Sequence, residues 1–140
     1  MGMKARNRVI SFVMLCVMLF ALTMQVCADA IVPRYNNADT TNETFAIDSN
    51  GVATVWYTCN GYSNKTTTIK VETQLQKKTW WWYNNVDGAY WKDVIDYYCC
   101  AGEHSIQLPQ SGTYKAIVTY TVYGSGGVAD VITKELEASY

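Results

Sequence analysis

Histidine is almost absent from this chain of 140 residues, which contains only His104. Nucleophilic catalysis by Ser, Thr or Cys needs a base within reach, and His104 lies between Glu103 and Ser105, where we expect a solvent-exposed loop. The sequence also has no Cys-x-x-Cys spacing and no glycine-rich phosphate loop. These absences predict that the protein is not an enzyme and has no catalytic residues, no metal site and no cofactor.

An excess of positive charge is missing as well, because 11 Lys and Arg face 12 Asp and Glu. Three of the basic residues, Lys4, Arg6 and Arg8, lie at the amino terminus, so the rest of the chain is acidic. An acidic domain lacks the electrostatic footprint that nucleic acids and anionic lipids require. We therefore expect no nucleic-acid partner.

The amino-terminal residues have the layout of a secretory signal peptide. The basic residues precede an apolar run at 9–24, and small residues follow at Ala28 and Ala30. The run has about 16 residues, fewer than the roughly 20 that a membrane-spanning helix needs. The sequence predicts a signal peptide at 1–28, cleavage after Ala28 or Ala30, and a secreted, extracellular protein with no membrane association after cleavage.

The remaining residues are too few for two ordinary domains and show no helical period. Residues 29–43 are polar and predict a flexible leader. In residues 66–78, Ile69, Val71 and Leu75 alternate with polar residues, which is typical of a strand with one buried face. Seven to eight such segments predict an all-β domain at 44–140, a single antiparallel β-sandwich.

Aromatic residues are abundant, with 5 Trp and 11 Tyr, and many of them flank Asp87 and Gly88, a dipeptide typical of a hairpin turn. Consecutive strand residues alternate sides, so residues 80–82 cannot all enter one core. Either the hairpin buries its rings in a secondary core or it exposes an aromatic binding surface. The candidate ligand-binding residues are Trp80, Trp82, Tyr83, Tyr90 and Trp91.

Three cysteines, Cys59, Cys99 and Cys100, lie beyond the predicted signal peptide. An odd number in an exported protein predicts one disulfide and one remaining thiol, or an intermolecular bridge. We expect a disulfide between Cys59 and either Cys99 or Cys100, and a disulfide-linked dimer is a further expectation. The alternative is three reduced, buried thiols.

The segment 112–116, Gly-Thr-Tyr-Lys-Ala, resembles the tyrosine corner of immunoglobulin-like sandwiches, although Ala116 stands where antibody domains carry a core cysteine. Together with Gly61-Tyr62, Thr68-Ile69, residues 75–78 and residues 91–94, it is similar to a group of small secreted β-sandwich proteins of Gram-positive bacteria without an established function. The resemblance implies an immunoglobulin-like fold and an extracellular compartment, and no activity.

Two functions fit these features. The first is a secreted, non-catalytic module that binds a glycan or a protein through the aromatic hairpin. The alternative is a structural or cell-surface interaction protein that self-associates. A continuous exposed aromatic patch would favour the binding module, and electrophoresis with and without reductant would reveal an intermolecular bridge.

Overall fold

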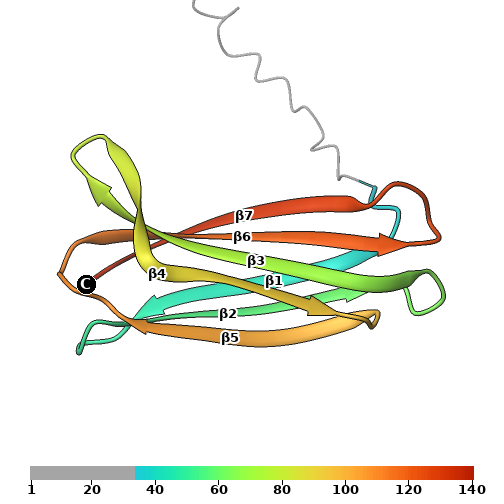
Figure 1. The fold of residues 1–140 in the computed structure, drawn as a ribbon, viewed down its shortest axis with the longest axis horizontal. Helices are drawn as coiled ribbons and strands as arrows, with labels where there is room; N and C mark the ends of the chain where they lie inside the picture. The colour runs from blue at the N-terminus through green and yellow to red at the C-terminus, as the bar shows by residue number, and fades with distance from the viewer. Residues whose placement is uncertain (1–33) are drawn as a thin grey trace, which may run out of the picture. The chain divides into compact units, whose positions relative to one another are not determined.

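The computed structural model describes residues 34–140, a domain built entirely from antiparallel strands (Figure 1). One sheet has the strand order β1-β2-β5 and the other has the order β4-β3-β6-β7. The strands are β1 (Ala38–Ile47), β2 (Val52–Gly61), β3 (Thr66–Thr79), β4 (Trp82–Ile95), β5 (Cys99–Gln107), β6 (Thr113–Gly124) and β7 (Asp130–Ser139). The predicted antiparallel, immunoglobulin-like β-sandwich is thus confirmed, with seven strands. The predicted signal peptide and both of its cleavage sites lie outside the described residues.

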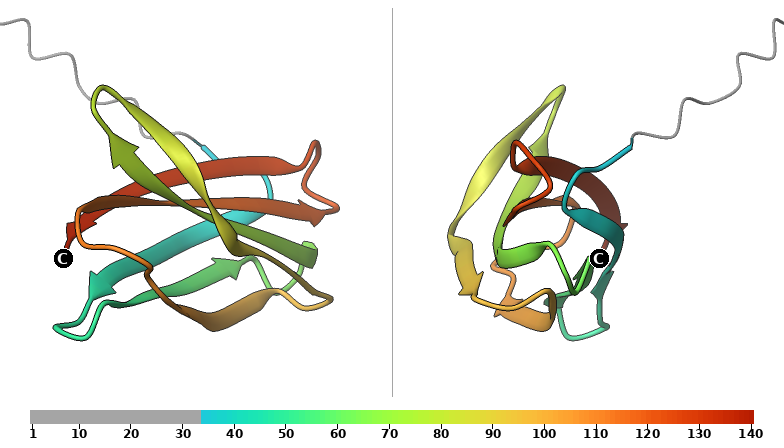
Figure 2. Two further views of the ribbon diagram at one scale, coloured as in Figure 1. Left: turned by 60° about the vertical axis from the view of Figure 1, so that its left-hand side comes forward. Right: turned by 90° about the vertical axis from the view of Figure 1, so that its right-hand side faces the viewer.

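The two sheets face each other across one apolar core, with the first strand pair and β5 on one side and the other four strands opposite (Figure 2). The alternation in β3 places Ile69, Val71 and Leu75 in this core, as expected. Their neighbours in the core include two fully buried tyrosines, Tyr114 and Tyr120, from β6. Burial of each large apolar side chain contributes roughly 1.5–3 kcal/mol, so these strands carry much of the stability.

The tyrosine corner forms at the start of β6. The Tyr114 hydroxyl donates a hydrogen bond to the backbone carbonyl of Gln110, with an O–O distance of 2.5 Å. This contact fixes the connection between β5 and β6, as in immunoglobulin-like sandwiches. The fourth strand departs from the constant-type arrangement, because β4 pairs with β3 and leaves β5 at the edge of the other sheet.

The predicted boundary between leader and domain at residue 44 is wrong, because β1 already begins at Ala38. The Asp130 carboxylate accepts backbone N–H bonds from Asn36, Asn37 and Ala38 at 2.9, 2.6 and 2.9 Å. Burial acts to raise the pKa of Asp130, but these three donors outweigh it and lower the pKa. The polar composition that predicted a leader instead supplies a buried Asn37 and an ordered strand entry.

The predicted hairpin turn at Asp87 and Gly88 is also wrong. Pairing of β3 with β4 continues past this point, and Gln74 faces Tyr90 while Gln76 faces Asn85. Residues 86–89 therefore form a large bulge, with Gly88 at a φ of 71°. The bulge points Ala89 into the core and packs Val86 against it, so tertiary burial overrides the local turn preference of Asp-Gly.

Candidate functional site

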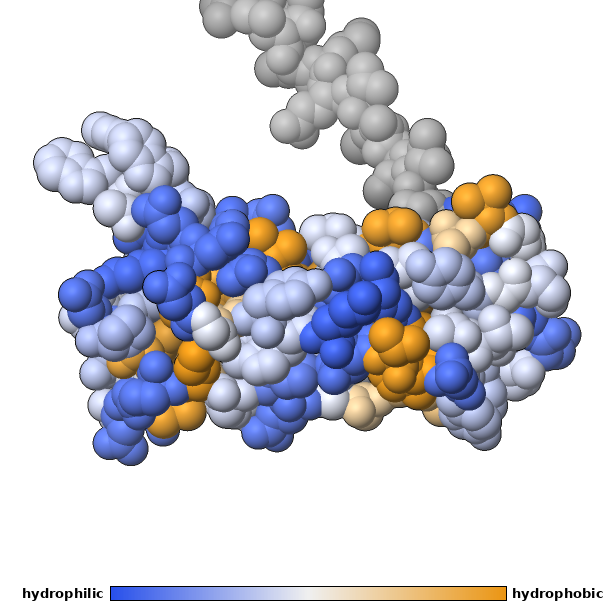
Figure 3. All heavy atoms as spheres, viewed as in Figure 1, coloured by the Kyte–Doolittle hydropathy of each residue, from blue (hydrophilic) through white to orange (hydrophobic). Residues whose placement is uncertain are grey.

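The hairpin between β3 and β4 turns at two residues, Trp80 and Trp81, because Thr79 pairs directly with Trp82. Figure 1 shows this end of the hairpin rising away from the other strands. We call residues 77–84 the arm. In Figure 3 the arm is a protrusion of intermediate hydropathy with strongly hydrophilic side chains around its base.

The three tryptophans at the end of the arm are open to solvent. Trp80, Trp81 and Trp82 are 81%, 83% and 60% exposed. Of the two outcomes that the sequence left open, the structure has the exposed one at these positions. Adjacent exposed indoles provide a large contact area with only two side-chain torsions each.

Trp80 has a backbone conformation that large residues avoid. Its φ is 58°, and among residues 34–140 it is the sole residue other than glycine with a positive φ. This region costs a residue with a Cβ roughly 1–2 kcal/mol, and a two-residue hairpin normally places glycine there. The turn thus combines backbone strain with an exposed indole, and such strain is concentrated at functional sites.

The two faces of the arm carry different chemistry. Directly paired residues share a face, so Trp82 lies on the same side as Thr79, Lys77 and Asn84. Tyr83 lies on the opposite side, where its hydroxyl donates to Glu137 at 2.5 Å and Lys115 Nζ lies 4.3 Å from its ring centroid. Tyr83 therefore ties the arm to β6 and β7.

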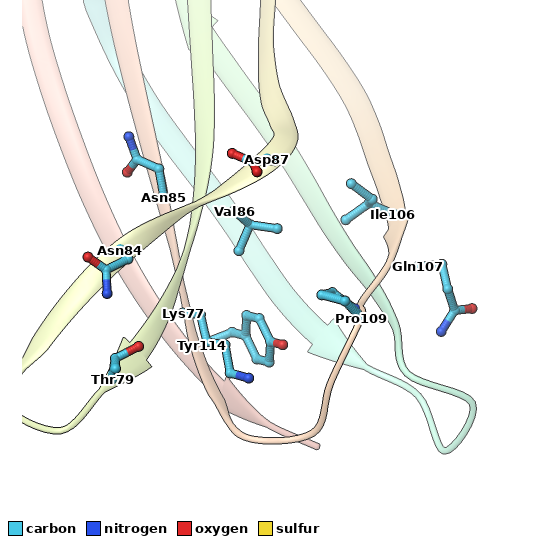
Figure 4. Close-up of a pocket in the computed structure, with 10 residues that line it drawn as sticks. All are labelled: Lys77, Thr79, Asn84, Asn85, Val86, Asp87, Ile106, Gln107, Pro109 and Tyr114. Carbon is cyan, nitrogen blue, oxygen red and sulfur yellow. The ribbon is translucent and has the colours of Figure 1, made fainter.

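A groove with a volume of about 490 Å³ lies on the Trp82 side, at the base of the arm (Figure 4). Its floor includes the apolar residues Val86, Ile106 and Pro109, and Figure 4 shows Val86 extending from β4 toward the other two. The polar residues of its lining are Lys77, Thr79, Asn84, Asn85, Asp87 and Gln107. Such a mixture of apolar surface and a few polar groups is typical of small-ligand sites.

No model of a known protein family matches this chain, and no curated protein matches it. No matching protein therefore indicates which residues bind a ligand, and the geometry of the arm alone supports the candidate site. Residues 34–140 contain no helix that is both long and apolar enough to span a membrane. In the same part of the chain, no group of three or more His, Cys, Asp or Glu side chains has the geometry of a metal site.

The structure does not gather the five predicted ligand-binding residues into one patch. Trp80 and Trp82 are at the end of the arm, and Tyr83 is at its back. Tyr90 pairs with Gln74, five residues before Thr79 and therefore about 17 Å from the end of the arm. Tyr90 is exposed on the outer face of β4, where its hydroxyl donates to Glu72 at 2.7 Å.

Trp91 belongs to a different cluster, on the inner side of β4. Its ring stacks on His104 of β5, with centroids 5.0 Å apart and planes 3° apart. His104 Nε2 lies 2.6 Å from Asp93 Oδ2, and the Tyr57 hydroxyl donates to the same oxygen at 2.6 Å. We call Tyr57, Trp91, Asp93 and His104 the seam cluster, because it joins the two sheets between their edge strands β4 and β5.

The prediction that His104 lies in a solvent-exposed loop is wrong. Strand β5 begins at Cys99, and its alternate residues Gly102, His104 and Ile106 are each less exposed than their neighbours. The sequence carries a matching signal, because Gly102, His104 and Ile106 alternate with polar residues. Burial acts to raise the pKa of Asp93, but the hydrogen bonds from Tyr57 and His104 outweigh it and lower the pKa.

The predicted disulfide is absent from the structure, in which Cys59, Cys99 and Cys100 are free thiols. Cys59 is nevertheless the direct cross-strand partner of Cys100. Contact with Cys100 and burial both raise the pKa of Cys59, whereas the contact with Cys59 lowers the pKa of Cys100. The register brings together one of the two predicted pairs and leaves Cys99 apart.

Sequence reasoning missed the groove. Asn84, Asn85 and Gln107 look like ordinary surface amides in the sequence, and Gln107 is far from the arm along the chain. Only the docking of the β5–β6 connection beside the arm brings them together. The candidate residues also omit Trp81, although its side chain is as exposed as that of Trp80.

Proposed function

We propose that this protein is a secreted, non-catalytic binding module that contacts its ligand through the tryptophan turn, residues 80–82. The supporting observation is the exposure of three consecutive indoles on an arm whose turn holds Trp80 at a φ of 58°. A structural role would bury these rings, since roughly 1.5–3 kcal/mol is available from burying each large apolar side chain.

The experiment is a binding assay of the purified protein on an array of extracellular glycans and proteins. We expect the double variant Trp80→Ala/Trp81→Ala to lose at least about tenfold in affinity, because exposed aromatic anchors dominate binding energy. The control is Trp56→Ala, which removes an exposed tryptophan from β2 on the other sheet. Equal affinity of the double variant and the unchanged protein would reject the turn as the contact site.

Secretion is part of the proposal and has its own test. The basic residues, apolar run and small residues before Asp29 support export. Mass spectrometry of the protein from the culture medium should give an amino terminus at Asp29 or Ile31. Recovery of only the uncleaved chain inside the cell would contradict this part.

A second candidate function is self-association through Cys99. Cys59 faces Cys100, so oxidation of that pair to a disulfide would leave Cys99, which is half-buried on the edge strand β5, to bridge a second copy. Each bridge releases two protons and passes two electrons to an extracellular disulfide oxidant. Electrophoresis without reductant should then show a dimer that Cys99→Ser abolishes, and a monomer under both conditions would exclude the bridge.

A further inference from the structure

We infer that the groove beside the arm binds an uncharged oligosaccharide, with Trp82 stacked on one of its sugar rings. This inference deepens the proposed function and rests on it, because the same arm supplies Trp82 and the turn. It adds the ligand class and a set of contacts outside the turn.

The first support is the position of Trp82. Its cross-strand partner is Thr79, which lines the groove, and the next inner pair on the same face is Lys77 with Asn84, which also line it. Trp82 is 60% exposed and does not line the groove itself, but it lies on the same face, next to the lining residue Thr79 and closer to the end of the arm. An indole beside a polar groove matches a sugar ring, which has apolar C–H faces and a polar rim.

The second support is the hydrogen-bonding capacity of the groove. Asn84 is exposed, and its side-chain amide makes no hydrogen bond within residues 34–140. Its NH₂ group and its carbonyl oxygen are therefore free to bind a ligand in the groove. Asn85 pairs with Gln76 on the face opposite Asn84, and its carbonyl oxygen accepts from Gln76 at 2.9 Å, so Asn84 is the amide of the arm that lies on the groove side. Side-chain amides both donate and accept, as sugar hydroxyls do.

The third support is charge. Lys77 and Asp87 are the only charged groups among the lining residues, and their charges are opposite. Lys77 Nζ already donates to Gln110 Oε1 at 2.6 Å and lies 5.8 Å from the centre of the Tyr114 ring. The groove offers no excess of positive charge to an anionic ligand, so it favours a neutral one.

Size is consistent with this class. The groove volume of about 490 Å³ lies within the range of roughly 300–1,000 Å³ that is common for small-ligand sites. The apolar floor at Val86 and Pro109 matches the C–H faces of a second sugar ring. We therefore expect an oligosaccharide to bind more tightly than a monosaccharide.

The test is titration calorimetry with the purified protein, using neutral oligosaccharides of two to six hexose or pentose units and, as anionic probes, oligouronates of the same lengths. We expect Trp82→Ala to weaken binding of the best neutral ligand about tenfold and Asn84→Ala about fivefold. Matched controls are Trp56→Ala and Asn60→Ala, which remove an exposed tryptophan and an exposed amide from β2. Both controls should stay within about twofold of the unchanged protein.

The outcomes separate this inference from the proposed function. If no neutral oligosaccharide binds, or if Trp82→Ala and Asn84→Ala bind as the controls do, the glycan site is wrong. If a protein ligand is lost with Trp80→Ala/Trp81→Ala but not with Asn84→Ala, the turn is confirmed and the groove is rejected. If the groove variants lose a neutral ligand but the turn variant does not, the groove is confirmed and the turn is rejected. Thermal unfolding of each variant establishes that it folds.

Discussion

The two tryptophans of β4, Trp82 and Trp91, lie in opposite environments. Trp82 and the turn residues before it are open to solvent, whereas Trp91 stacks on His104 and helps join the two sheets. These residues belong to one aromatic-rich segment of the sequence, residues 80–91, and the bulge at 86–89 separates its two halves in space. The comparison teaches that aromatic density alone does not define a site, because a strand irregularity decides which rings reach the core.

The bulge also explains why the arm leaves the sandwich. Four residues of β4 oppose Leu75 alone, which increases the local bend and twist. Ala89 is buried in the core and Val86 packs against it, and Figure 1 shows the end of the strand pair rising away from the other strands. The arm is held instead by Tyr83 and Glu137 on its back.

The sharpest test of this difference is to replace one tryptophan in each region and compare the free energies of unfolding. We expect Trp91→Ala to lower the free energy of unfolding by about 2–3 kcal/mol, because it removes a half-buried ring and its stack on His104. Trp81→Ala should change it by less than about 0.5 kcal/mol, as is usual for exposed side chains. Urea denaturation of both variants gives the result, and equal losses would show that the two regions do not differ.

The seam cluster should also make stability depend on pH. The pKa of Asp93 is lowered in the folded protein, so its contribution is present above its unfolded pKa of about 3.9 and is lost as the pH falls through the lower folded value. Asp93→Asn should therefore reduce stability at pH 7, and the difference from the unchanged protein should shrink toward pH 3. Asp39→Asn, an exposed change in β1, is the control. A difference that stays constant from pH 7 to pH 3 would contradict the role of Asp93.

Much of the fold could be predicted from the sequence, because apolar and polar residues alternate along the strands. The alternation around Ile69 and Val71 predicted the buried face of β3, and the Gly112–Ala116 motif predicted the tyrosine corner. The failures came from local signals that long-range contacts overrode. Asp87 and Gly88 favour a turn, but pairing of β3 with the whole of β4 converts them into a bulge.

The candidate site was predictable only in part for the same reason. The density of aromatic residues pointed to the exposed turn, because the predicted candidates Trp80 and Trp82 lie on either side of Trp81. The groove combines the arm with Gln107 and Pro109, and no pattern in the sequence brings these segments together. His104 looked exposed because its sequence neighbours are polar, although neighbours in a strand point to the opposite face.

A smaller effect should come from the anchor of the arm. Tyr83→Phe removes the hydroxyl that donates to Glu137 and keeps the ring beside Lys115. We expect amide hydrogen exchange in residues 77–84 to accelerate a few-fold, because local opening requires less free energy, with no change in β6. Tyr90→Phe is the matched control, because it removes a hydroxyl that donates to Glu72 on the other side of the bulge from the arm. Unchanged exchange in the arm of Tyr83→Phe would show that the anchor has no effect.

The most direct test of the central claim is Trp80→Gly, assayed for both stability and ligand binding. Glycine adopts a φ of 58° without strain, which offsets its larger unfolded-state entropy, so we predict a free energy of unfolding unchanged or raised by up to about 1 kcal/mol. Affinity for the ligand should fall about tenfold. A loss of more than about 1 kcal/mol of stability would show that Trp80 supports the fold. Affinity equal to that of the unchanged protein would show that Trp80 does not contact the ligand.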